Sequence, residues 1–143
     1  MTTMNKDIKN SSLDLAFESI DSCFGYVDYI TSQIQKLIVC YNQGEVEQAQ
    51  NSFSEVIELM DLYIQLVSKV YRVLRTDLPT INFKDESLQK LEIHLLSVMK
   101  ALLQAKEKND TIMLCDLLEY ELIDNLTQWK IKVLPELKKL KNY

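Results

Sequence analysis

Residues 53–74 read FSEVIELMDLYIQLVSKVYRVL, and this stretch decides the fold class. Its apolar residues recur at steps of three and four, the period of an α-helix with one buried face; they are Phe53, Val56, Met60, Ile64, Val67, Tyr71 and Leu74. A second apolar row lies beside the first and comprises Leu59, Leu62, Tyr63, Leu66, Val70 and Val73. The helix is therefore apolar around most of its circumference here, which predicts that it is central or covered by a partner.

The same spacing recurs along the rest of the chain and predicts an all-α protein. We expect long helices over about 12–41, 45–74, 86–108 and 111–134, followed by a short basic helical end. Short links at Gly44 and Asn109 join the first two and the last two helices, an arrangement typical of an antiparallel up-down four-helix bundle. Pro135 lacks an N–H group, so we expect a kink or a break there.

The chain is expected to form one domain. Residues 1–11 are polar and aperiodic, which predicts a flexible N-terminal tail. Residues 12–143 are enough for a single helical-bundle domain with a sizeable core. Gly25 lies inside the first helix, where glycine is costly, and predicts close contact with a neighbouring helix.

Composition excludes several classes of function. The 143 residues include only two glycines and two prolines, so no glycine-rich loop is present to hold a phosphate. The net charge of −5 argues against nucleic acid and anionic membranes as partners. The three cysteines have no CxxC spacing and are expected to be buried free thiols. With no apolar run long enough to span a membrane and no apolar leader, a cytoplasmic protein is expected.

His94 is the only histidine, so a di-metal carboxylate site cannot be built, and no cofactor or metal is expected. Histidine phosphotransfer domains carry a pattern similar to H-x-L-K-G around their histidine. The segment from His94 to Val98 reads HLLSV, and after the histidine it keeps only the leucine of that pattern. We therefore favour a histidine at the core boundary bonded to a neighbour, with phosphotransfer as the less favoured alternative. Glu119 and Glu121 border the apolar face of the last helix. They are expected to bond a tyrosine hydroxyl or pair with lysine or arginine, rather than to act as acid and base.

Without a nucleophile, base and cleft that can be named, we expect no enzyme. The excess apolar surface of residues 56–74 favours a binding role, either for another protein, as in a chaperone or adaptor, or for a second copy in a homodimeric structural protein. The candidate protein-binding residues are Leu59, Leu62, Tyr63, Leu66, Val70, Val73, Tyr120 and Trp129.

Residues 109–122 read NDTIMLCDLLEYEL, and with Trp129 they form the most distinctive segment of the chain. Over about residues 88–134 the chain resembles small bacterial helical proteins of the flagellar export chaperone type. The resemblance implies a cytoplasmic bundle that holds an export substrate in an apolar groove between long helices. Residues 1–12 lack the tyrosine-bearing segment of the flagellin chaperones, which argues against flagellin itself as the ligand.

Overall fold

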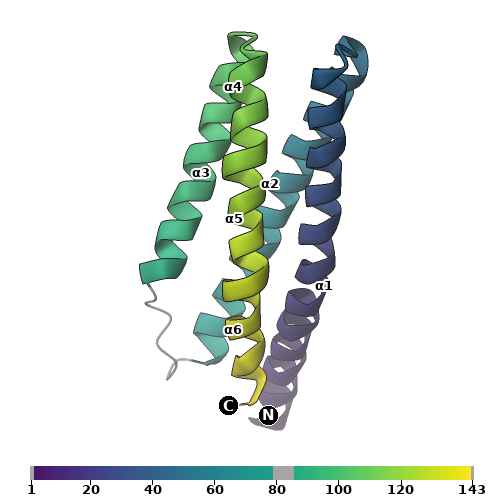
Figure 1. The fold of residues 1–143 in the computed structure, drawn as a ribbon. Coiled ribbons are helices and arrows are strands. Elements are labelled where there is room, and N and C mark those ends of the chain that lie inside the picture. Colours follow the sequence, from purple (N-terminus) through teal and green to yellow (C-terminus); the bar gives the residue numbers. More distant parts are fainter. Residues whose placement is uncertain (1, 79–85, 143) are drawn as a thin grey trace.

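A computed structural model describes residues 2–78 and 86–142, and every element in these ranges is helical (Figure 1). The first three helices are α1 (Thr2–Asn42), α2 (Val46–Asp77) and α3 (Glu86–Glu107). A fourth, continuous helical segment, here called the C-terminal helix, consists of α4 (Thr111–Asp116), η1 (Leu117–Leu122), α5 (Ile123–Gln128), η2 (Trp129–Val133), α6 (Leu134–Lys139) and η3 (Leu140–Asn142). The all-α bundle of four long helices is confirmed.

The four helices pack as two pairs. The helices α1 and α2 lie along each other, and α3 lies along the upper part of the C-terminal helix (Figure 1). The C-terminal helix also packs against α1 over most of its length, which joins the two pairs. The backbones of α2 and α3 barely approach each other in the described part of the chain. As a result, α1 is the main backbone neighbour of α2.

Both described turns follow from local chemistry. Gly44 adopts a φ of +70°, and the amide of Glu45 donates to the carbonyl of Cys40 at 3.0 Å, which closes the end of α1. Asn109 adopts a φ of +54° after α3, a conformation that asparagine tolerates better than most residues. The Oδ1 atom of Asp110 then accepts a hydrogen bond from the amide of Met113 at 3.0 Å and caps α4. The expected link around Pro79 lies outside the described residues.

The core is an apolar seam along the axis of the bundle. Large side chains that are almost fully buried come from α1, α2, α3 and the C-terminal helix; they include Ile34, Met60, Leu102 and Leu122. Trp129 is also buried, and its ring packs edge to face with that of Tyr63, with centroids 5.8 Å apart and planes at 89°. This contact connects α2 to the C-terminal helix across the core.

Two predicted boundaries are wrong. The helix α1 begins at Thr2 and not at about residue 12, so residues 2–11 are helical and continue α1. The segment contains no glycine or proline, and extending an existing helix costs far less than starting one. At Pro135, where a kink or a break is expected, the helix does not break. The π-helical turn η2 precedes it, and the amide of Leu134 donates to the carbonyl of Trp129, five residues back.

The interpretation of Gly25 is wrong as well. Gly25 is exposed on α1, and a Cβ atom built there meets nothing within 4 Å. The residue lies on the side of α1 opposite to the buried row of Cys23, Val27 and Ile30. No neighbouring helix in the described chain therefore requires a glycine at this position.

Replacing this glycine should stabilise the protein. Because Gly25→Ala lowers the backbone entropy of the unfolded chain without a clash, we expect the free energy of unfolding to rise by about 0.5–1 kcal/mol. Gly44→Ala is the matched control. It places a side chain at positive φ and should lower the free energy of unfolding by about 1–2 kcal/mol. Urea denaturation followed by circular dichroism measures both, and a loss of stability in Gly25→Ala would contradict the placement of Gly25.

Candidate functional site

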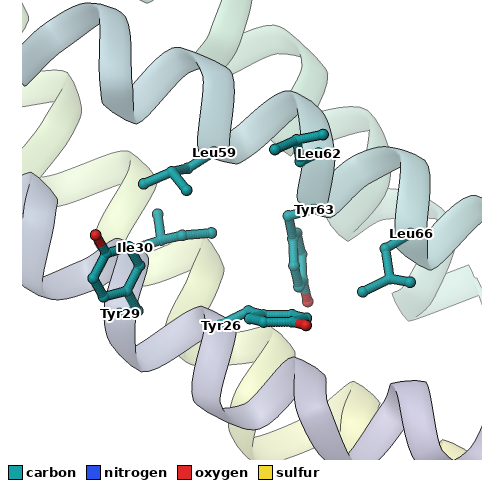
Figure 2. Close-up of a pocket in the computed structure, with 7 residues that line it drawn as sticks. All are labelled: Tyr26, Tyr29, Ile30, Leu59, Leu62, Tyr63 and Leu66. Carbon is teal, nitrogen blue, oxygen red and sulfur yellow. The ribbon is translucent and has the colours of Figure 1, made fainter.

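An apolar cavity lies on the outer side of the α1–α2 pair (Figure 2). It has a volume of about 310 Å³, at the lower end of the range of ligand pockets. Its walls are apolar or aromatic and come only from α1 and α2: Tyr26, Tyr29, Ile30, Leu59, Leu62, Tyr63 and Leu66. We call this the α1–α2 groove.

Two helical faces build the rim of the α1–α2 groove. Leu59, Leu62 and Leu66 follow each other at steps of three and four along α2, next to its core row. On α1, Tyr26 and Tyr29 are three residues apart and lie beside the core residue Ile30, both on the same side of it. The two tyrosines are each 49% exposed and Leu62 is 56% exposed. The groove thus presents three large side chains that are only half covered by the protein.

Tyr63 forms the inner wall of the groove. Its side chain is only 3% exposed, and its hydroxyl end is drawn beside that of Tyr26 (Figure 2). This hydroxyl is buried and has no hydrogen-bond partner among the described residues. Burial raises the pKa of Tyr63, and the nearby Cys23 and Tyr71 groups add to the rise. The hydroxyl therefore stays protonated, and its hydrogen-bonding capacity is unused within the described residues.

The structure brings together four of the eight candidate protein-binding residues. Leu59, Leu62, Tyr63 and Leu66 line the α1–α2 groove. The other four lie elsewhere: Val70 and Trp129 are buried in the core, Val73 is half-buried, and Tyr120 is exposed on the C-terminal helix. Trp129 reaches the groove only indirectly, through its contact with Tyr63.

The tyrosines on α1 are the groove residues that the sequence analysis did not identify. Tyr26 and Tyr29 stand beside the regular apolar row of α1 and not within it. Their signal was two aromatic residues three positions apart on a flank that is otherwise polar. That signal becomes meaningful only when the flank is known to face the second row of α2.

His94 belongs to a separate polar cluster between α3 and the C-terminal helix. Its Nε2 atom lies 2.8 Å from Oε2 of Glu121, and its Nδ1 atom lies 2.9 Å from Nδ2 of Asn125. The same Nδ2 group of Asn125 donates to the carbonyl of Leu91 at 3.1 Å. Because an amide nitrogen only donates, Nδ1 of His94 must accept, and its proton sits on Nε2 and is donated to Glu121.

This cluster corrects one expectation. Glu121 bonds the histidine and not a tyrosine, lysine or arginine, while Glu119 is exposed and forms no hydrogen bond or ion pair within the described chain. Asn125, the buried residue that holds the cluster together, was not identified from the sequence. Among the described residues, no group of three or more histidine, cysteine or acidic side chains could hold a metal ion.

Fold and groove together define a class: an all-helical four-helix bundle with an apolar groove on one helix pair. No helix within the described ranges combines the length and the apolar character needed to cross a bilayer. Residues 18–132 match the family described as Domain of unknown function (DUF8042), and the chain belongs to this family. No curated protein and no solved structure matches the chain.

The histidine cluster generates a testable prediction. In Asn125→Ala, His94 loses its donor at Nδ1, and we expect the free energy of unfolding to fall by about 2 kcal/mol because two hydrogen bonds are lost. Imidazole ¹⁵N chemical shifts should show the Nε2–H form of His94 in the wild type at neutral pH and a mixture of forms in the variant. Glu119→Ala should change neither property. An Nδ1–H form in the wild type would refute the arrangement.

Proposed function

We propose that the protein is a non-enzymatic binding module, chaperone- or adaptor-like, whose α1–α2 groove receives an apolar helix face of another protein. The observation that carries this proposal is the cavity of about 310 Å³ with purely apolar and aromatic walls, open at the surface beside Tyr26, Tyr29 and Leu62. Large exposed side chains that gather around a cavity are typical of interaction surfaces.

The shape of the groove favours a helix as the bound element. Its two walls are parallel rows on adjacent helices, so a third helix can lie along them with side chains at i, i+3 and i+7 facing inward. The cavity accepts one large anchor side chain. Tyrosine is common at the centres of such interfaces because its large ring loses little conformational entropy on binding.

The alternative function, histidine phosphotransfer at His94, has less support from the geometry. A phosphoryl group needs a ring nitrogen with a free lone pair, and both nitrogens of His94 are engaged by Glu121 and Asn125. The carboxylate of Glu121 would also repel the incoming phosphate. A link to bacterial flagellar export and a cytoplasmic location stay predictions that rest on the sequence.

A photo-crosslinking amino acid placed at Leu62 tests the proposal in cells of the source organism. We expect a defined crosslinked protein, which can be identified by mass spectrometry and purified. Its affinity for the wild type should exceed its affinity for Leu62→Glu by at least about tenfold, because the substitution puts a charge into an apolar interface.

The matched control is Ile93 on α3. It is 64% exposed, similar to Leu62 at 56%, but lies outside the α1–α2 groove. A photo-crosslinker at position 93 should give none of the products found at position 62, and Ile93→Glu should bind the partner as the wild type does. Identical products at both positions, or equal binding by Leu62→Glu, would refute the groove as the binding site.

A further inference from the structure

We propose that the α1–α2 groove also binds a second copy of the same chain, in an antiparallel arrangement with a two-fold axis at the level of Leu62. The inference rests on the proposed function, since it uses the same groove. In this arrangement α1 lies over α1 of the second copy, and α2 lies over α2. The argument depends on the charges that border the groove, on the shape of its rim and on its area.

The charges along α2 are self-complementary about Leu62. Glu55 stands seven residues before Leu62, and Lys69 stands seven residues after it. Seven residues are close to two helical turns, so all three lie on one face of α2. Both charged residues are exposed, and neither makes an ion pair among the described residues. An antiparallel second copy places its Lys69 opposite Glu55 and its Glu55 opposite Lys69.

The helix α1 repeats this pattern at the same level. Glu18 and Lys36 lie nine residues on either side of position 27, between the two groove tyrosines. They are separated from Tyr29 by eleven and seven residues, which are whole numbers of helical turns to within about 20°. Both are exposed and make no ion pair in the described chain. The same two-fold axis therefore pairs Glu18 with Lys36 of the second copy.

The rim of the groove also has the form that a two-fold interface needs. An isologous contact requires that one face carry both projections and recesses. Here Leu62 projects at the axis, and Leu59 lies opposite Leu66 of the second copy. Tyr29 lies opposite Gly25 of the second copy, where the open space beside the missing side chain accommodates its ring.

The exposed apolar area of the groove is small, and this favours a pair of long helices over a short peptide as its occupant. Two half-exposed tyrosines and one leucine alone offer only about 300–400 Å² of apolar surface, below the ~800 Å² per partner of a standard interface. Pairing along α2 from Glu55 to Lys69 extends the contact over about 21 Å, and pairing along α1 from Glu18 to Lys36 extends it over about 27 Å. The apolar centre alone is too small to form a stable interface, and the charged residues that pair at both ends of the contact enlarge it.

A charge-swap experiment tests the arrangement by sedimentation velocity at low salt, where charge pairs are least screened. The wild type should show a dimer whose population rises with concentration. Glu55→Lys sets lysine against lysine at two symmetric places, and Lys69→Glu sets glutamate against glutamate. Each single variant should raise the dissociation constant by about tenfold or more.

Two combinations should restore the dimer. An equimolar mixture of the two single variants places the lysine introduced by Glu55→Lys opposite the glutamate introduced by Lys69→Glu and should form a heterodimer. The double variant Glu55→Lys with Lys69→Glu should form a homodimer like the wild type. Circular dichroism of each variant controls for folding, which exposed substitutions on α2 should leave unchanged.

Several outcomes would overturn the inference. A wild type that is monomeric at every concentration refutes the second copy as an occupant, and single variants that dimerise like the wild type refute the antiparallel register. The failure of this inference is distinct from that of the proposed function. If the protein is monomeric but still crosslinks to another protein through position 62, the groove remains a binding site. If position 62 crosslinks neither to a second copy nor to another protein, both the dimer and the proposed function are refuted.

Discussion

The contact between the rings of Tyr63 and Trp129 is the interaction on which the rest of the structure depends. Within the described residues the backbone of α2 lies close mainly to α1, so its attachment to the other helix pair relies largely on side chains that cross the core. Tyr63 and Trp129 are the largest of these, and both are almost fully buried. Their edge-to-face geometry is favourable beyond the area that it buries. The opposite surface of Tyr63 is free to form the inner wall of the groove, because the indole holds the ring in place.

Most of the fold could be predicted from the sequence, since three-and-four spacing is a strong signal in long segments. The ends of helices were less predictable. At residues 2–11 no glycine or proline stops the chain, and a helical segment without an apolar row leaves no periodic signal in the sequence. At Pro135 the π-helical turn supplies a different hydrogen-bond register, which depends on the backbone of Trp129 and leaves no trace in the spacing of side chains.

The groove could be predicted only in part. The second apolar row of α2 pointed to Leu59, Leu62 and Leu66, since these residues exceed what one core seam requires. Val70 and Trp129 were predicted to bind a partner in the same way, but the structure shows that both are buried in the core. Sequence periodicity defines a helix face but not which neighbour covers it. Asn125 shows the same limit in reverse. Its spacing to Leu122 and Trp129 is that of a core position, yet only the structure shows that His94 and Leu91 accept hydrogen bonds from its Nδ2 group.

Binding and stability are coupled because α2 serves both. Its core row holds the helix against α1, and its second row leaves Leu62 more than half exposed, which forgoes about 1 kcal/mol of possible burial. A partner that covers the groove recovers this free energy and packs directly on Tyr63. Because Tyr63 also contacts Trp129, an occupied groove strengthens the link between the two helix pairs. A ligand that binds only the folded protein stabilises it in proportion to the logarithm of its concentration. The helix α2, which forms one wall of the groove and also contacts Trp129 through Tyr63, is therefore an element that an occupant of the groove protects.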